Sequence, residues 1–192
     1  MGRQVHRAGS EGYGVAVRFI ETSLKGACLV EIEPVQDERG FFARCWCERE
    51  FARRGLVSNF VQCNISFNRS KGTVRGMHFQ AAPHEESKLV RCTAGAIQDV
   101  IVDLRPNSPT FRQWLGAELS AGNRKMLFVP KGFAHGFQTL TDDTEVEYQM
   151  SEFHVIESAR GYRWDDPAFR ISWPLAVSAI SDGDRNFPGF VE

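Results

Sequence analysis

Short apolar or alternating runs recur along the chain, and Gly, Pro, Asn and Asp interrupt them every few residues. Runs of this length are typical of β-strands, because an amphipathic helix needs a longer stretch with its own period. That helical period is brief here: it predicts one short helix at 48–54, which Gly55 ends, and another near Pro167. The predicted strands cover Val15 to Ile20, Cys28 to Glu33, Phe41 to Cys47, Phe60 to Ser66, Leu89 to Ala94, Ile97 to Leu104, Trp114 to Leu119, and Met126 to Val129.

The order of these elements predicts an all-β fold. Strands follow one another without alternating helices, which favours a closed double sheet such as a jelly roll over an open sheet. The length of 192 residues fits a single domain spanning 1–192. Residues 1–14 are rich in Gly and polar side chains, so we expect them to be flexible, and 180–192 is predicted to form an irregular strap over the barrel.

Charge and hydropathy limit the partners. A formal net charge of -1 supplies no basic field, so nucleic acid is not expected as a partner, and an anionic ligand must be held by a few placed cations. No run approaches the roughly 18 apolar residues of a membrane span, and the opening segment lacks the apolar stretch of a secretory signal. We therefore expect a cytoplasmic protein with no membrane partner.

The five cysteines make an odd number, which excludes a complete disulfide framework. We interpret them as reduced and mostly buried thiols.

The segment 72–80 departs from a plain core strand. Arg75 and His78 are three residues apart, so a regular strand would point them to opposite sides. Gly76 lies between them and permits a bulge that turns both inward, a device often found beside active sites. A structural histidine beside a surface arginine is the alternative.

A second segment, 129–137, carries a Pro-x-Gly-x-x-His turn that aims His135 into the barrel. A metal site there would need three or four nitrogen or oxygen ligands. His78 is followed by Phe-Gln at 79–80, whereas a second histidine would be needed, and the polar loop at 84–86 is expected to be solvated. We therefore expect no metal, with a metal-dependent enzyme as an alternative.

Six motifs in order, lying between Asp37 and Asp184, carry a resemblance to a known family. They are Asp37 to Phe42, Arg75 to Gln80, Lys88 to Arg91, Val102 to Arg105 with Ser108 to Phe111, Pro130 to Phe137, and Trp164 to Pro167. Together they resemble the dTDP-4-dehydrorhamnose 3,5-epimerases, which are cupin-fold isomerases of deoxysugar nucleotide biosynthesis. The resemblance implies a cupin-type double-stranded β-helix, with no metal or organic cofactor.

The resemblance also implies roles for particular residues. His78 is the general base, held by the carboxylate of Asp184, and Tyr148 is the general acid on the opposite face. Lys88 stabilises the enolate oxygen. The residues implied to bind substrate are Arg75 and His135 in the same pocket and Arg39, Gln62 and Asn64 at the nucleotide.

Inversion of a carbon beside a ketone requires a base, an acid and a group that stabilises the enolate. The substrate implied is a nucleotide-diphosphate 4-keto-6-deoxy sugar, inverted at C3, at C5 or at both. A proton beside a ketone is weakly acidic, so the base must be close and the developing enolate must meet positive charge or donors. Histidine has a reference pKa of about 6.5, near cell pH, whereas tyrosine, near 10, stays protonated and supplies the proton on the other face.

Departures from the family pattern concentrate on the nucleoside. Arg44 stands where the family has a glutamate, Cys63 replaces an aspartate and Gly183 replaces a lysine. His154 aligns with a stacking tyrosine, and Ala159 with a binding glutamate. We therefore include Arg44 and His154 among the candidate substrate-binding residues, with the hypothesis that the nucleotide is CDP or GDP in place of dTDP.

Two further functions stay open at this point. One is an epimerase acting at C3 only or C5 only. The other is a non-catalytic sugar-nucleotide-binding cupin, although His78, Tyr148 and Asp184 are all present.

The resemblance also implies a homodimer in which N-terminal strands cross between subunits. The run Val15 to Ile20 is the candidate for that strand, and an ordinary strand within one subunit is the alternative.

Overall fold

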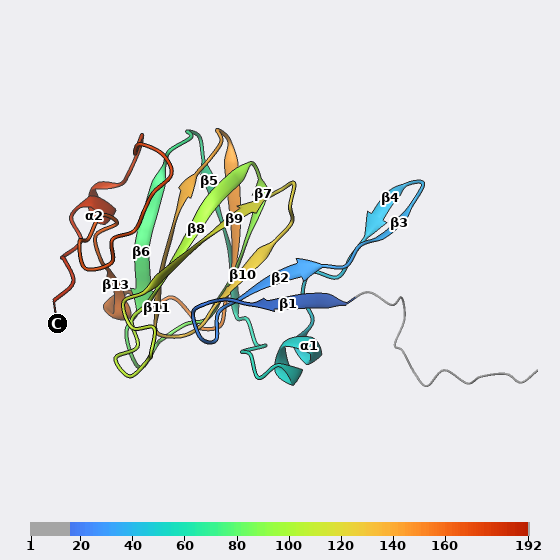
Figure 1. Cartoon of the computed structure of the whole chain (residues 1–192), viewed down its shortest axis with the longest axis horizontal. Coiled ribbons are helices and arrows are strands. Elements are labelled where there is room, and N and C mark those ends of the chain that lie inside the picture. Colours follow the sequence, from blue (N-terminus) through green and yellow to red (C-terminus); the bar gives the residue numbers. More distant parts are fainter. Residues whose placement is uncertain (1–15, 192) are drawn as a thin grey trace, which may run out of the picture.

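Two antiparallel sheets pack face to face and enclose the core (Figure 1). The computed structural model describes residues 16–191. The six-stranded sheet has the order β1 (Val17–Glu21), β2 (Cys28–Ile32), β10 (Met126–Val129), β7 (Lys88–Ala94), β12 (Thr144–Met150), β5 (Gln62–Asn68). The five-stranded sheet has the order β13 (Ala159–Gly161), β6 (Val74–Gln80), β11 (Phe133–Thr139), β8 (Ala96–Asp103), β9 (Trp114–Ser120). The predicted all-β, cupin-type jelly roll is confirmed.

The core forms from alternate residues of facing strands. Val90 and Val146 point inward from the six-stranded sheet, and Ile97, Ile101 and Phe137 meet them from the five-stranded sheet. Each is almost fully buried. Because side chains alternate between the two faces of a strand, the residues between them are free to serve the outer faces.

The outer face of each sheet is covered by a different segment. Helix α1 (Glu48–Arg53) inserts Phe51 against Phe128, with their ring centroids 6.0 Å apart. On the other side, the C-terminal segment packs Phe169 against Met77 and Val102 of the five-stranded sheet. Figure 1 shows this segment, in red, lying along β6. Residues 180–191, the C-terminal strap expected from the sequence, contain one short helix, α2 (Asp182–Arg185), and Phe190 packs against the same apolar cluster.

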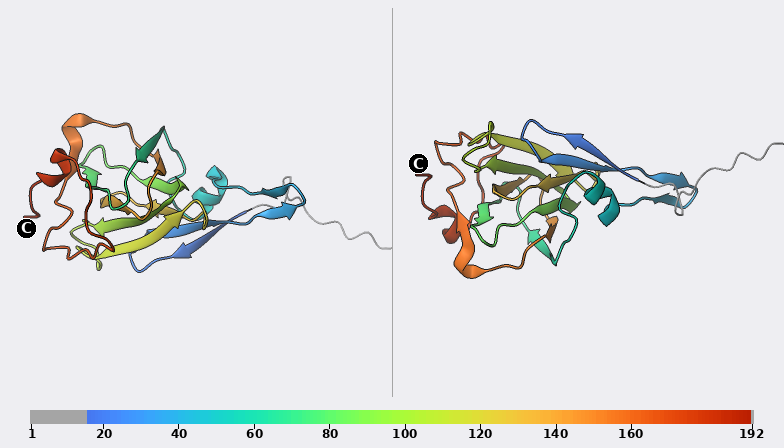
Figure 2. Two further views of the ribbon diagram at one scale, coloured as in Figure 1. Left: turned by 90° about the horizontal axis from the view of Figure 1, so that it is seen from above. Right: turned by 90° about the horizontal axis from the view of Figure 1, so that it is seen from below.

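A small hairpin extends away from the barrel. Strands β3 (Val35–Asp37) and β4 (Gly40–Phe42) pair only with each other. Figures 1 and 2 show them projecting beyond the two sheets. The predicted strand from Phe41 to Cys47 is therefore wrong beyond Phe42, because the chain leaves the hairpin there and runs irregularly to α1.

The chain near Pro167 and strand β1 bear on two further predictions from the sequence. The chain near Pro167 forms turns, not a helix: the Asp166 carbonyl accepts from the amides of Phe169 and Arg170, and Arg170 then has φ 54° and ends the turn. Strand β1, in the run expected either to cross to a second subunit or to stay within its own, pairs with β2 of the same chain. Residues 1–14, expected to be flexible, lie outside the described residues. Within the described part of the chain, no helix is long and apolar enough to cross a membrane.

The five cysteines are all free thiols. Burial raises the pKa of Cys28 and of Cys92 to about 11, so both stay protonated near neutral pH. Cys45 and Cys47 are half-buried and Cys63 is exposed. The prediction that most are buried is therefore wrong: Cys45 and Cys47 lie in the irregular stretch before α1, and Cys63 is exposed on the edge strand β5.

Asp103, the last residue of β8, fixes the loop that follows. Its carboxylate is fully buried and accepts hydrogen bonds from Arg105 Nη2 at 2.7 Å, Ser108 Oγ at 2.5 Å and Thr110 Oγ1 at 2.7 Å. Burial alone would raise the pKa of Asp103, but these donors lower it to about 2. The loop is thus held by one ionised side chain.

Replacing Asp103 with Asn should lower the free energy of unfolding by about 2 kcal/mol near pH 7, because the depressed pKa measures how much the fold prefers the ionised form. The carboxylate stabilises the fold fully above its unfolded pKa, near 4, and this contribution is lost as pH falls through about 2. Urea unfolding across that interval should show the difference between wild type and Asp103→Asn shrinking. As a control, Asp165→Asn breaks an exposed pair with Arg163 and should cost under about 1 kcal/mol; an equal cost for both would contradict this.

Candidate active site

A cavity of about 540 Å³ lies between the two sheets. Strands β5, β7 and β12 form one wall, and β6 and β11 form the other. The candidate site residues that line it are Asn64, Arg75, His78, Lys88, His135, Tyr148 and His154, and Ala159 lines it as well. These side chains come from segments spread over positions 64 to 159 of the sequence, and the fold brings them together around one cavity.

His78 is held by a carboxylate from the C-terminal strap. Its Nε2 lies 2.6 Å from Asp184 Oδ1. The strap is fixed in turn: Asp184 N donates to Ser181 Oγ at 3.0 Å, and Gly76 N donates to Asp184 Oδ2 at 3.3 Å. A proton on Nε2 shared with the carboxylate leaves Nδ1 of His78 as the nitrogen able to accept another proton.

Asp184 is suited to stabilise a protonated imidazole. Burial alone would raise its pKa, but the hydrogen bond and charge of His78, followed by the Gly76 amide, lower it below the ordinary value. The carboxylate therefore stays ionised near neutral pH. An ionised partner favours the imidazolium that forms when His78 takes a proton.

Phe187, also on the strap, covers the imidazole of His78. The two ring centroids are 5.6 Å apart in an edge-to-face arrangement. A Cβ on Gly161 would lie 2.5 Å from the Phe187 ring, so only glycine leaves room for it there. The strap thus supplies both the carboxylate and an apolar cover for the candidate base.

Gly76 allows Arg75 and His78 to reach the same cavity. The register between β6 and β11 shifts between these two residues. Gly76 has φ 127°, which favours glycine, and a Cβ there would lie 2.6 Å from Gly136 Cα. The bulge predicted from the sequence is confirmed, and Arg75 turns inward to donate to Asn68 Oδ1 at 2.7 Å.

Tyr148 lies on the opposite wall, on β12. Its ring packs edge-to-face against His135 with centroids 6.0 Å apart. Burial raises the pKa of Tyr148, the negative charge of Asp99 raises it further, and the Ser66 hydroxyl opposes this only in part. The phenol therefore stays protonated near neutral pH and can donate a proton into the cavity.

His135 forms a second histidine–carboxylate pair, directly across from the first. It is the register partner of His78 on the neighbouring strand. Its Nε2 lies 2.7 Å from Asp99 Oδ1, and the Asp99 side chain is fully buried. Among the described residues, Asp99 Oδ2 has no hydrogen-bond partner. This pair keeps a negative charge close to Tyr148.

Lys88 begins β7 beside the same cavity. Its Nζ lies 3.0 Å from Glu86 Oε1, and the two side chains are only 9% and 8% exposed. The prediction that the 84–86 loop is solvated is therefore wrong for Glu86, which turns inward. Sequence reasoning missed Glu86 because a polar loop gives no sign of the direction in which one of its side chains points.

Three candidate binding residues lie outside the lining of this cavity. Arg39 is at the tip of the β3–β4 hairpin and pairs with Asp37 on the surface. Arg44 pairs with Glu50 of α1 at 2.7 Å. Gln62 lies at the rim, where its Oε1 accepts from the amide of His154 at 2.6 Å.

Arg160 lines the cavity and was missed by sequence reasoning. Its Nη1 donates to the carbonyls of Glu157 and Ala159, at 2.8 Å each. Nothing in the sequence distinguishes it from a surface arginine, because the 3-10 turn η1 (Ile156–Ser158) that orients it gives only a weak pattern.

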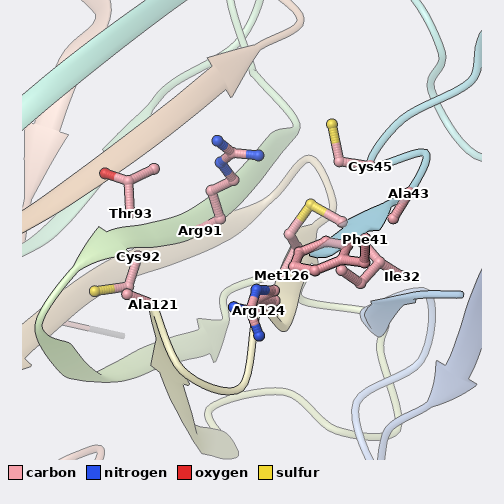
Figure 3. Close-up of a pocket in the computed structure, with 10 residues that line it drawn as sticks. All are labelled: Ile32, Phe41, Ala43, Cys45, Arg91, Cys92, Thr93, Ala121, Arg124 and Met126. Atoms are coloured by element: carbon pink, nitrogen blue, oxygen red, sulfur yellow. The ribbon is translucent and has the colours of Figure 1, made fainter. Parts of the chain in front are cut away.

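A second cavity, of about 310 Å³, lies on the outer side of the six-stranded sheet. Figure 3 shows Arg91 and Arg124 there, with Phe41 from the hairpin and Cys45. The Arg124 guanidinium sits 4.7 Å from the centre of the Phe41 ring and so holds the base of the hairpin. Among the described residues, its lining includes no histidine or carboxylate, so it lacks the acid–base groups of the first cavity.

No group of three or more His, Cys, Asp or Glu side chains within residues 16–191 is arranged to hold a metal ion. The expectation of a metal-free and cofactor-free enzyme stays a prediction.

Comparison with known proteins identifies the family. A family model described as dTDP-4-dehydrorhamnose 3,5-epimerase matches residues 21–192. The chain belongs to this family. The dTDP-4-dehydrorhamnose 3,5-epimerase of Methanothermobacter thermautotrophicus is 46% identical over 173 residues, which cover 88% of this chain and 92% of that protein.

Solved structures of three sugar epimerases share the fold. The enzyme from Bacillus anthracis, with TDP and PPi bound, has a TM-score of 0.88 and 43% identity, covering 91% of this chain and 100% of that one. The enzyme from Legionella pneumophila, in complex with dTDP-4-keto-L-rhamnose, has a TM-score of 0.84 and 35% identity, covering 91% and 93%. A 3'-monoepimerase from Streptomyces bikiniensis, in complex with dTDP-quinovose, has a TM-score of 0.82 and 28% identity, covering 88% and 86%.

Gly76→Ala tests whether the bulge in β6 requires glycine. The added Cβ meets backbone at 2.6 Å and the φ is unfavourable, so the free energy of unfolding should fall by about 2 kcal/mol or more. Urea unfolding measures this. The control Gly122→Ala has Ser120 Oγ as its nearest neighbour at 3.8 Å and should change stability by under about 1 kcal/mol. A Gly76→Ala protein as stable as wild type would contradict the requirement for glycine.

Proposed function

We propose that this chain epimerises a dTDP-linked 4-keto-6-deoxy sugar at C3 and C5, the carbons beside the ketone. One observation carries the proposal: a carboxylate-held imidazole, His78, and a protonated phenol, Tyr148, line opposite walls of one cavity. Inversion needs a base on one side of a carbon and an acid on the other. A binding protein needs neither, so this pairing favours an enzyme over a non-catalytic cupin.

The steps follow from these positions. His78 takes the proton from the carbon beside the ketone, and the electron pair of that C–H bond forms a C=C bond while the ketone oxygen becomes an enolate. The ammonium of Lys88 stabilises the enolate charge, and Asp184 stabilises the imidazolium. Tyr148 then gives its proton to the carbon from the other side. The ketone forms again and the centre is inverted.

We propose dTDP as the nucleotide of this substrate. The relatives from Bacillus anthracis and Legionella pneumophila are described with TDP and with dTDP-4-keto-L-rhamnose, which favours dTDP over CDP or GDP. The contact of Arg44 with Glu50 also weakens the argument for a changed nucleotide, because this guanidinium is already paired within its own chain. His154 and Ala159, which differ from the family pattern, line the cavity and are the differences that bear on recognition of the nucleobase.

A single-site epimerase is the second candidate. The Streptomyces bikiniensis relative is described as a 3'-monoepimerase, and it shares the fold with this chain at a TM-score of 0.82. The number of carbon centres inverted is therefore measured directly, from the positions at which deuterium enters the sugar.

Proton exchange in D₂O separates the base from the acid. His78→Ala should lower deuterium incorporation at C3 and C5 by about 10²–10⁴-fold while dTDP affinity stays nearly unchanged, because the imidazole acts mainly in the transition state. Tyr148→Phe removes only the hydroxyl, so exchange should persist while inversion is impaired. NMR of the recovered sugar locates the deuterium and shows whether one or two centres exchange. Equal loss of exchange and inversion in Tyr148→Phe would contradict its role as the acid.

We also propose that the enzyme is a homodimer in which the hairpin of each chain reaches the cavity of the other. Arg39, implied to bind the nucleotide, is exposed at the tip of a hairpin that projects from its own barrel (Figure 2). Apolar side chains are exposed on the same hairpin and on the edge strand β5 beside the cavity: Val35, Phe41, Ile65 and Phe67. Such exposed apolar groups favour burial against a second copy. The cytoplasmic location expected from the sequence stays a prediction.

Mixing two defective chains tests the shared site. In a mixed dimer of Arg39→Ala and His78→Ala chains, one cavity would combine His78 from one chain with Arg39 from the other. After random exchange of subunits, about a quarter of the cavities should be complete, so activity at low substrate concentration should rise well above that of either variant alone. The control mixes His78→Ala with Tyr148→Phe. His78 and Tyr148 lie in the same cavity of the same chain, so every cavity in this mixture lacks one of them and activity should not recover. No recovery in the first mixture would show that Arg39 serves its own chain or no cavity.

A further inference from the structure

A buried carboxylate faces the lysine of the cavity. Glu86 Oε1 lies 3.0 Å from Lys88 Nζ, and the Glu86 side chain is only 8% exposed. The other oxygen, Oε2, accepts from Gln80 Nε2 at 3.1 Å. Because both carboxylate oxygens have partners, Glu86 has one fixed orientation, with its charge next to the ammonium.

Gln80 holds this arrangement from behind. It is 4% exposed, and its Oε1 accepts from the amide of Val155 at 2.7 Å. Its Nε2 shares two N–H hydrogens among three acceptors: Glu86 Oε2 and the carbonyls of His84 and Phe153, the last two at 3.0 and 3.1 Å. One side chain on β6 thus joins the loop that carries Glu86 to the loop that follows β12. Glu86 therefore cannot swing away from Lys88 without breaking contacts in both loops.

The ion pair has a physical consequence for Lys88. Withdrawal from water favours the neutral amine of a lysine, and an ionised carboxylate at hydrogen-bond distance favours the ammonium. Only the ammonium can stabilise an enolate oxygen by charge. The other ionisable groups that line the cavity are His78, His135, Tyr148, His154, Arg75 and Arg160, and among these the arginines and any protonated histidine would oppose a further positive charge.

We propose that Glu86 is a positioning residue of the epimerase reaction, which holds the Lys88 ammonium directed at the substrate ketone. This inference rests on the proposed function and extends it to a residue outside the base–acid pair. Glu86 itself does not touch the reacting atoms in this scheme. It acts through Lys88.

Glu86→Gln keeps the shape and removes the charge. At neutral pH, kcat should fall about tenfold with KM within about twofold, because the lysine is still present but less well oriented. The alkaline limb of the pH–kcat profile should move to lower pH, since the buried ammonium has lost its counter-charge. Glu86→Asp keeps the charge and should restore the position of this limb. The matched control is Glu85→Gln, an equal change of charge in the same loop, which should leave the profile unchanged.

A double-mutant cycle distinguishes positioning from general damage. In a Lys88→Ala background, Glu86→Gln should change kcat by less than about twofold, because its effect passes through the lysine. A full effect of Glu86→Gln in that background, or a wild-type pH profile in the single variant, would overturn the proposal.

A second readout does not depend on catalysis. An amine-reactive anhydride labels only the neutral form of lysine, and mass spectrometry of the digested protein follows Lys88 alone. Labelling of Lys88 should be faster in Glu86→Gln than in wild type across the same pH range, and equal rates would overturn the proposal. Wild-type protein without epimerase activity would overturn the proposed function and this inference together, whereas active wild type with an unaffected Glu86→Gln variant overturns this inference alone.

Discussion

The hydrogen bond between His78 and Asp184 is the contact on which the site depends. It joins the middle of β6 to the C-terminal strap, two segments 106 positions apart in the sequence. The strap also helps to cover the outer face of the five-stranded sheet, because its Phe190 packs against the apolar cluster that contains Met77 and Phe169. Packing of the strap therefore brings the carboxylate to the imidazole, and the stability of the fold and the arrangement of the candidate base share one cause. Gly76 connects the two directly, because its amide also donates to Asp184.

A sandwich of two sheets suits chemistry that works from two sides. The candidate base is on the five-stranded sheet and the candidate acid, Tyr148, is on the six-stranded sheet. Each side chain is fixed by its own strand, so the gap between the sheets sets the separation of base and acid. A base and an acid on facing walls suit a reaction in which a proton leaves a carbon on one side and returns on the other.

The sequence allowed much of the fold to be predicted, because alternation and turn residues act over a few neighbours. It also predicted the bulge at Gly76, where a glycine between two polar residues is a local signal. The prediction failed for Glu86 and for the strand after Phe42, where tertiary contacts decide the direction of a side chain or the end of a strand. Nor could the separation of Arg39 from the cavity be predicted from a motif, since a motif gives neighbours in sequence and says nothing of the distances between motifs in the fold.

The charges around the cavity divide into two groups with different uses. Two groups of the proposed proton transfer are matched by a carboxylate: His78 by Asp184, and Lys88 by Glu86. Such pairing fixes the orientation of both side chains, and it leaves little net charge. Two guanidiniums have neutral partners instead. Arg75 donates to the Asn68 amide, and Arg160 donates to backbone carbonyls. A neutral acceptor orients a guanidinium without cancelling its charge, so these two side chains keep an attraction for an anion. In a chain whose net charge is close to zero, this is how a cavity can hold a diphosphate and still move protons with groups whose charges are balanced.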